Sequence, residues 1–398
     1  MATWALTARW VFPVDGPPLE RGVVAIDEDR ITAVEPRGGR TPDVDLGAAA
    51  VLPGLVNAHT HLDLTGMRGL APPTPDFTGW LRQVIAHRRG RTPEQVQADI
   101  RAGRAESLRY GTTLLGDISG DGGSWDVLAD GPGRAVVFRE ILGLSKERAS
   151  GAWADLDAWL ASHPATPICR PGVSPHAPYS ACASLFLAAS ASPVPAALHL
   201  AETAAEQELL ALRRGPFVPF LKDLGAWAPD GLAGSVGHIV RLFNGPSPAL
   251  FIHANYLPPD TPIPRNGSIV YCPRTHAAFG HPPHPFRAFL ARGVRVTLGT
   301  DGLASNPDLS LLEEARFLHR RHPDVPGDAV LRMATLSGAE ALGWADVTGS
   351  LTPGKSADLV VLPLPAEEHA DPHRLVLESD RPVERVLWRG RWLGGIAR

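Results

Sequence analysis

The segment VLPGLVNAHTHLDLTGMRGL, residues 51–70, decides the fold of this chain and suggests its chemistry. An apolar run at 51–56 opens the segment as a short buried strand would, and His59 and His61 follow at a spacing of two. Because successive side chains on a strand point to opposite faces, this spacing places both imidazoles on one face. Two converging imidazoles suit Zn²⁺ or Fe²⁺, although an isolated His-x-His pair also arises by chance in a long chain. The pair is therefore good evidence for a metal site only if further candidate ligands follow later in the sequence.

Apolar segments of strand length recur through the middle of the chain, and segments with helical spacing separate them. The expected strands lie at 51–56, 112–115, 135–141, 168–173, 196–200, 250–253, 268–271 and 294–298. Eight strands alternating with helices over about 300 residues predict the α/β class, specifically a (β/α)₈ TIM barrel. A doubly wound open sheet is the alternative, but no Gly-x-Gly-x-x-Gly pattern follows any of these strands.

The two ends of the chain have a different pattern, with short strands and little helical spacing. Residues 23–26 and 31–34 flank a polar turn, which predicts a β-hairpin, and the C-terminal part contains similar short apolar runs. We therefore predict that residues 1–50 and 352–398 together form a small β-sandwich domain, and that residues 51–351 form the barrel domain.

The amino-acid composition indicates what class of protein this is and which partners are expected. The chain has 398 residues, of which 44% are hydrophobic and 20% charged, so it can bury a large core. Its 38 basic and 42 acidic residues form no basic run, which argues against nucleic acid as a partner. No signal peptide and no membrane span are recognisable, and the three scattered cysteines fit a reducing cytoplasm. We expect a cytoplasmic protein with a small-molecule substrate, and a homodimer is a possible assembly.

Polar residues follow several expected strands at the ends that would form one rim of the barrel. His176 lies just past the fourth strand, His199 and His253 lie on the fifth and sixth, and Asp301 closes the eighth; Glu202 follows His199 by three residues. Alone, each histidine is more often a hydrogen-bonded core residue, and Asp301 could merely cap a turn. Their joint placement favours a catalytic metal site, in which imidazoles and a carboxylate leave room for water.

At these residues the chain resembles the amidohydrolase superfamily, on the branch of purine and pyrimidine deaminases and chlorohydrolases. The matching motifs are PGLVNAHTHLDLTGMRG, SPHAPYS, HLAET, HANYL, CPRTHAAFG, GTDGLASNPDLSLLEEAR and GSLTPGKSADLVVL. The resemblance implies one set of metal ligands, namely His59, His61, His199 and Asp301. Binuclear relatives carry a modified lysine on the fourth strand, and residues 167–178 contain no lysine. We therefore expect one divalent ion, with Zn²⁺ favoured over Fe²⁺.

The resemblance also implies catalytic roles for Glu202, His253 and Asp301. Glu202 and Asp301 would take the proton of an activated water, and His253 would orient that water. Glu202 would then deliver a proton to the ring nitrogen as ammonia leaves. We predict a hydrolytic deaminase that acts on an adenine-type base in a nucleoside or nucleoside-like compound. Hydrolysis of another C–N or C–Cl bond, as in guanine, cytosine or a triazine, is the alternative, and a non-catalytic metal-binding scaffold is a remote one.

Candidate substrate contacts lie just beyond the expected strand ends. They are Asp63, Arg68, Glu140, His176 and, in the segment after the first strand, Trp80. That segment, DFTGWLRQVIAHRR at 76–89, resembles aminodeoxyfutalosine deaminases, although its apolar residues could equally be the buried face of a helix. Arg68 could hold the carboxylate of such a substrate bidentately, or could pair with Glu140. The sequence leaves open the role of His276, which stands where relatives commonly have asparagine, and that of the insertion at 203–248.

Overall fold

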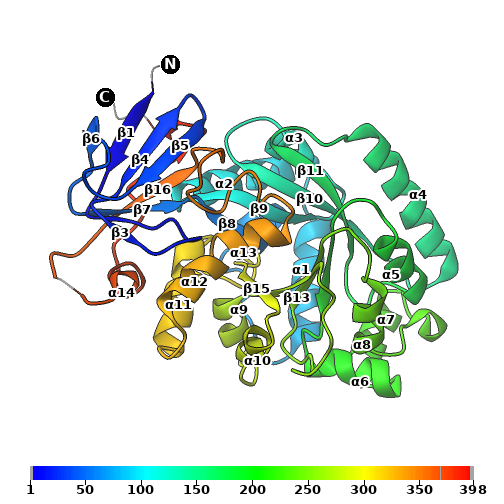
Figure 1. Cartoon of the computed structure of the whole chain (residues 1–398). Helices are drawn as coiled ribbons and strands as arrows, with labels where there is room; N and C mark the ends of the chain where they lie inside the picture. The colour runs from blue at the N-terminus through cyan, green and yellow to red at the C-terminus, as the bar shows by residue number, and fades with distance from the viewer. Residues whose placement is uncertain (1–2, 368, 395–398) are drawn as a thin grey trace. The chain divides into compact units, whose positions relative to one another are not determined.

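The computed structural model, drawn in Figure 1, describes residues 3–367 and 369–394 of the chain. The chain divides into two compact units, each made of segments that are separated in sequence. One unit takes Met1–Ala58, Ala105–Leu115 and Leu309–Arg398, and the other takes His59–Arg104 and Gly116–Asp308. The predicted domain boundaries, at residues 50 and 351, stay a prediction.

The largest sheet has eight strands, and their spatial order follows their order in the chain. The strands are β8 (Leu55–Thr60), β9 (Thr112–Ser119), β10 (Arg134–Ile141), β11 (Cys169–Pro175), β12 (Ala196–Leu200), β13 (Ala249–His253), β14 (Gly267–Tyr271) and β15 (Arg295–Leu298). Neighbours from β10 to β15 pair in parallel. After β15, the backbone N–H groups of Thr300 and Asp301 both donate to the His59 carbonyl at 3.1 Å, which brings the last strand back to the first. The predicted (β/α)₈ barrel is therefore confirmed.

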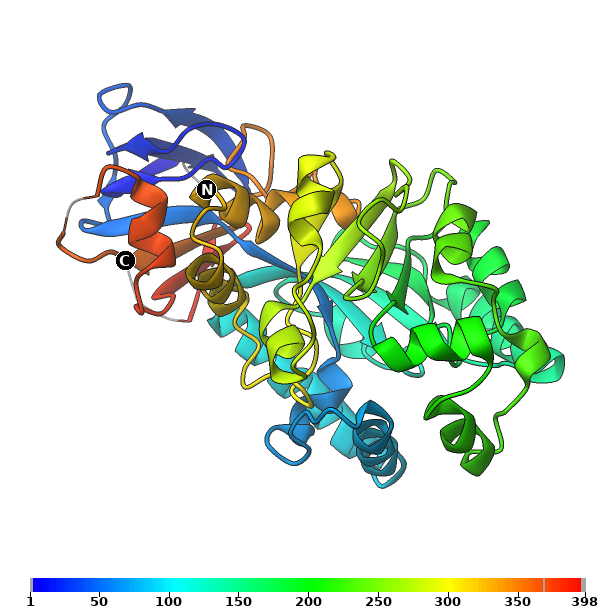
Figure 2. The ribbon, with the colours of Figure 1, turned by 90° about the horizontal axis from the view of Figure 1, so that it is seen from below.

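Helices follow the strands, as the alternating pattern predicted, and in Figure 2 the helices drawn in green lie outside the strands. They are η1 (Leu62–Met67), α1 (Phe77–Arg89), α2 (Pro93–Arg109), α3 (Trp125–Leu128), α4 (Lys146–Ser162), α5 (Ala183–Ser190), α6 (Ala204–Leu212), α7 (Phe217–Asp223), η2 (Pro229–Gly231), α8 (Val236–Leu242), α9 (Pro273–Ala278), α10 (Phe286–Ala291), α11 (Leu311–Arg321), α12 (Gly327–Met333), α13 (Leu336–Ala341) and α14 (Pro372–Leu377). The insertion at 203–248 thus contains three α-helices, α6 to α8, and the short η2. Among the described residues, no helix combines the length and apolar character needed to cross a membrane.

The terminal segments form two further sheets, one of order β5-β4-β1-β6 and one of order β18-β17-β16-β7-β2-β3. Their strands are β1 (Trp4–Thr7), β2 (Trp10–Val11), β3 (Leu19–Glu20), β4 (Val23–Asp27), β5 (Arg30–Glu35), β6 (Val44–Asp45), β7 (Ala49–Pro53), β16 (Leu359–Pro363), β17 (Arg385–Trp388) and β18 (Arg391–Leu393). The predicted hairpin is confirmed, since β4 and β5 pair antiparallel. One core joins the two sheets, with Leu6, Ile26 and Leu359 among its buried residues. Segments from both ends of the chain therefore pack together, as expected of a small sandwich.

Polar residues on the central barrel strands stand out because the strands around them are buried on both faces. Every residue of β12 and β13 is buried, which explains why these strands read as continuous apolar runs and not as alternating ones. The histidines of β12 and β13, His199 and His253, lie at or next to the C-terminal end of each strand. A buried polar group without a partner costs about 1–3 kcal/mol, so these positions call for a specific interaction.

The junction between the last and first strands leads to a stability prediction. A Cβ atom on Gly299 would lie 2.9 Å from Cβ of His59 and 3.0 Å from its carbonyl oxygen. Such overpacking typically costs about 1–3 kcal/mol, so Gly299→Ala should lower the melting temperature and displace the His59 backbone. In the control Gly120→Ala, the added methyl would meet nothing within 4 Å. Thermal unfolding of both variants checks this, and equal melting temperatures would contradict it.

Candidate active site

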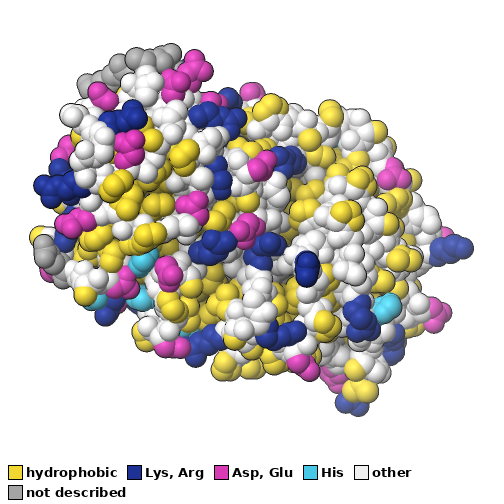
Figure 3. Space-filling view, in the orientation of Figure 1, with side chains coloured by type: hydrophobic (Ala, Val, Ile, Leu, Met, Phe, Trp, Pro, Cys, Tyr) yellow, Lys and Arg dark blue, Asp and Glu magenta, His cyan; other side chains and the backbone are white. Residues whose placement is uncertain are grey.

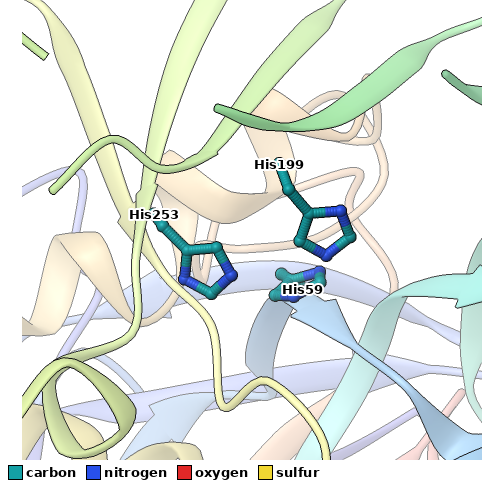
Figure 4. A group of neighbouring side chains, drawn as sticks. All are labelled: His59, His199 and His253. Carbon is teal, nitrogen blue, oxygen red and sulfur yellow. The ribbon is translucent and has the colours of Figure 1, made fainter. Parts of the chain in front are cut away.

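Histidines from separate barrel strands gather at one point (Figure 4). His59 comes from β8, His199 from β12 and His253 from β13, and the rings of His199 and His253 point toward that of His59. One potential ligand atom from each of these residues lies within 4.8 Å of the other two, and the same holds for His59, His61 and Asp301. The structure thus brings together every residue predicted to bind the metal.

The distances between these groups fit a divalent ion among them. The His61 and His199 Nε2 atoms are 3.2 Å apart, and Asp301 Oδ1 lies 3.3 Å from His59 Nε2 and 3.6 Å from His61 Nε2. Ligands bound at 2.0–2.1 Å with tetrahedral angles would lie about 3.3 Å apart. Imidazole nitrogens and a carboxylate oxygen are also donors that Zn²⁺ accepts. The residues therefore fit a single divalent metal ion.

Neighbouring groups set the protonation states that metal binding requires. The Nδ1–H of His199 donates to the His176 carbonyl at 3.0 Å, so its Nε2 carries the lone pair. Burial lowers the pKa of His61 and of His199 well below the usual value, which keeps both rings neutral. Burial opposes ionisation of Asp301, but its hydrogen bond and electrostatic interaction with His59 hold the pKa of its carboxyl below the usual value. Ser305 also donates to Asp301 Oδ2 at 2.6 Å. Neutral imidazoles and an ionised carboxylate are the forms that bind a metal.

Glu202 is placed to move protons beside this cluster. Its Oε1 lies 3.4 Å from His253 Nε2, and both side chains are buried. Burial raises the pKa of Glu202 well above its usual value, and the nearby carboxylates of Asp301 and Glu206 raise it further. A raised pKa favours the protonated form of a carboxyl group, which is the form that acts as a general acid.

The strand ends that carry these groups have strained backbone. Ala201, His253, Ala254 and Asp301 all have φ between 52° and 66°, in the left-handed region that residues other than glycine rarely occupy. Each such residue costs on the order of 1–3 kcal/mol, and this strain persists only where surrounding structure imposes it. Its concentration beside the histidines and Asp301 fits a functional site.

A cavity of about 330 Å³ opens onto these residues. Its lining includes the candidate ligands and catalytic groups His61, His199, Glu202, His253 and Asp301. Much of the remaining lining is apolar and comes from α1, α7 and adjoining loops, including Phe77, Trp80, Leu81, Val84, Ile85, Tyr179, Phe220 and Leu221. A largely apolar cavity with a few converging polar groups is typical of a small-molecule site.

Three of the predicted substrate contacts line this cavity and two do not. Trp80, Glu140 and His176 line it. Asp63 is not among its lining residues, and Arg68 is exposed and donates to the carbonyl of Pro307. The structure therefore does not bring Arg68 to the cavity, because its guanidinium bonds the Pro307 carbonyl.

Arg88, on α1, lines the cavity and pairs with Glu140. Its guanidinium lies 3.0 Å from the Asp63 carboxylate and 3.4 Å from that of Glu140, and Glu140 in turn lies 3.8 Å from His176 Nε2. Burial opposes its charge, but Asp63 and Glu140 hold the pKa of Arg88 above its usual value. A signal was present in the sequence, since Trp80, Val84 and Arg88 recur at a spacing of four on one helix face.

His276 lies outside the cavity lining, although its sequence position suggested a substrate contact in relatives. Its ring Nε2 lies 2.9 Å from the Pro282 carbonyl, in the loop between α9 and α10. This bond ties α9 to that loop. Tyr179, which was not predicted, does line the cavity and stacks on Phe217 at 4.3 Å between ring centroids.

Comparisons with known proteins identify the family. The amidohydrolase family pattern matches residues 50–393. The chain is 33% identical over 87% of its length to a 5-methylthioadenosine/S-adenosylhomocysteine deaminase of Nitratidesulfovibrio vulgaris, covering 80% of that protein. The structure is similar to an adenosine deaminase of Xanthomonas campestris with bound zinc, at 26% identity and a TM-score of 0.78, covering 98% of this chain and 92% of that one. It is also similar in fold to Helicobacter pylori aminofutalosine deaminase in complex with methylthio-coformycin, at 24% identity and a TM-score of 0.85, covering 98% and 100% of the two chains.

The chain belongs to the amidohydrolase family, as its motifs predicted. The prediction of a hydrolytic deaminase is confirmed by the same comparisons. Family membership, the zinc-bound neighbour and the histidine–aspartate cluster together support a divalent metal ion.

The ligand geometry predicts the metal content of variants. We expect about one ion per chain in the purified protein, because the donor set is complete for one site. His199→Ala should lose most of the metal and most of the activity, because it removes one of the four proposed ligands, whose Nε2 lies 3.2 Å from that of His61. His238→Ala, at an exposed position on α8, is the control and should retain both. Metal analysis checks this prediction, and two ions per chain that are both needed for activity would contradict it.

Proposed function

We propose that this protein is a mononuclear metal-dependent aminohydrolase that releases ammonia from the adenine-type base of a nucleoside or nucleoside-like compound. The observation that carries the proposal is the meeting of one complete donor set with Glu202 in a single cavity. Zn²⁺ suits three imidazoles and a carboxylate, and β11 offers no lysine to bridge a second ion.

The residues divide the reaction among them. His59, His61, His199 and Asp301 would hold the ion, which when bound lowers the pKa of water so that a nucleophile is available near neutral pH. His253 would hydrogen-bond the attacking water, and Asp301 would accept its proton. Glu202 would donate its proton to the ring nitrogen next to the attacked carbon. Asp301 would then pass the water proton to the leaving amine, and Glu202 would take the remaining hydroxyl proton as the C–N bond breaks, which restores both carboxyl groups.

The relatives and the cavity support an adenine-type substrate. The Nitratidesulfovibrio vulgaris protein is named for methylthioadenosine and S-adenosylhomocysteine, two adenine nucleosides that carry a sulfur substituent. The apolar side chains of α1 and α7 suit a bulky substituent of this kind. Aminodeoxyfutalosine stays one candidate within the class. Another C–N or C–Cl substrate, such as a guanine or a triazine, is the alternative, and the complete donor set counts against a non-catalytic scaffold.

Glu140 and His176 would contact the sugar hydroxyls. Both line the cavity, and the guanidinium of Arg88 lies 3.4 Å from the Glu140 carboxylate. This assignment replaces the carboxylate clamp that the sequence suggested for Arg68.

Three expectations from the sequence stay predictions. The first is the absence of a nucleic-acid partner, and the face shown in Figure 3 agrees with it, since basic and acidic side chains are interspersed there. The cytoplasmic location and the homodimer are the other two.

Glu202→Gln should separate metal binding from proton transfer. Glutamine keeps the shape of the side chain but cannot donate or accept the catalytic proton, so kcat should fall at least ~10²-fold. Metal content should stay at the wild-type level, because Glu202 is not one of the proposed ligands. Steady-state kinetics and metal analysis on the same samples check this. A variant with near-normal kcat would show that another group handles the protons.

Substrate choice tests the proposal as a whole. Ammonia release should be fastest, by kcat/KM, with adenosine-type nucleosides in a panel of amino-purines, pterins and pyrimidines. If Glu140 binds the sugar, Glu140→Gln should reduce the preference for adenosine over 2′,3′-dideoxyadenosine about tenfold, the value of one charged hydrogen bond. Arg68→Met is the control and should leave that preference unchanged.

A guanine-, pterin- or pyrimidine-type amine that is turned over far faster than every adenine-type compound would refute the proposed function. An unchanged preference in Glu140→Gln would refute the sugar contact alone.

A further inference from the structure

Glu206 is a buried carboxylate outside the proposed metal and substrate contacts. It lies in the first turn of α6 and is fully buried, at 0% exposure. Its Oε1 accepts the N–H of Ala201 at 2.7 Å, and its Oε2 accepts the N–H of Glu202 at 3.4 Å. Burying a carboxylate is costly unless it gains such partners, so the contact is specific.

The backbone that Glu206 holds is the turn between His199 and Glu202. Ala201 occupies the left-handed region there, with φ at 52°. Alanine has no intrinsic preference for this conformation, so the turn must be stabilised by its surroundings. Asn255 supports the same turn from the next strand end, since its Nδ2 donates to the Glu202 carbonyl at 3.0 Å.

Helix capping does not account for the arrangement. Thr203 is the N-cap residue of α6, and its hydroxyl accepts the N–H of Glu206 at 3.1 Å. In a capping box, the glutamate would return to the N–H of the N-cap residue itself. Here the carboxylate reaches past Thr203 to the two preceding residues, one of which is Glu202.

We propose that Glu206 is a positioning residue that sets the Glu202 carboxyl beside His253 by holding the backbone of residues 201 and 202. This inference rests on the proposed role of Glu202 in proton transfer. Glu206 is neither among the residues that line the cavity nor among the candidate ligands, and its hydrogen bonds go to the backbone of residues 201 and 202, so it would act through Glu202.

The kinetic test uses Glu206→Gln in metal-loaded protein. An amide offers one acceptor in place of two, so one of the two N–H groups loses its partner. We expect kcat to fall at least about tenfold with KM changed less than about threefold and metal content unchanged, because a small misplacement of a catalytic group is costly. Glu208→Gln is the matched control on the same helix. Glu208 is 37% exposed, pairs with Arg214, and should give wild-type values.

A double variant separates positioning from general destabilisation. If Glu206 acts through Glu202, then Glu202→Gln combined with Glu206→Gln should be no slower than Glu202→Gln alone. A further tenfold loss in the double variant would overturn the proposal, since it would show an independent effect.

Amide hydrogen exchange tests the same idea without any substrate. In Glu206→Gln, at least one of the two amides, of Ala201 or of Glu202, should exchange at least about tenfold faster than in wild type, and in Glu208→Gln neither should. If the protein deaminates no adenine-type nucleoside, the proposed function fails while the exchange result still decides the role of Glu206. If the glutamine variant does not fold, Glu206→Asp replaces it in the exchange experiment, because the aspartate side chain is too short to reach both amides. Wild-type exchange at both amides in a folded variant would overturn the proposal.

Discussion

The carboxylate of Asp301, buried against imidazole rings, is the constraint on which the rest of the site depends. Its Oδ1 lies within 3.6 Å of both His59 and His61, and its own backbone N–H donates to the His59 carbonyl. An ionised group in such a place is stable only with a compensating cation or proton. The same residues at the junction of β15 and β8 therefore close the barrel and form the candidate metal site.

The barrel brings the groups together, but buried side chains outside the strands fix their directions. His284 holds the His253 carbonyl through an Nε2 contact of 2.6 Å, Ser305 donates to Asp301, and Glu206 holds the turn before Glu202. Each supports a residue at or beside a backbone position with positive φ. Strain at the strand ends is thus offset by polar groups a few residues further along the chain or on the next loop.

The cavity combines this polar site with an apolar wall. Arg88 links Asp63 to Glu140, so a charge network extends from the loop after β8 to the end of β10. The helical insertion after β12 supplies α7, which adds Phe220 and Leu221 to the lining. In this fold, the residues of such loops would determine which substrates bind, whereas the residues at the strand ends would carry out the reaction.

The amino-acid sequence by itself predicted the barrel and the family, and it marked the histidines and Asp301 that the structure brings together. Histidines that end continuous apolar strands are visible without coordinates, because buried strands tolerate few polar residues. Only the tertiary structure decided between Arg68 and Arg88. Both arginines follow the first strand and carry a guanidinium group. Arg68 donates to the Pro307 carbonyl, whereas the packing of α1 turns Arg88 toward Glu140. Helical spacing shows which residues share a face, and only packing against distant segments decides what that face meets.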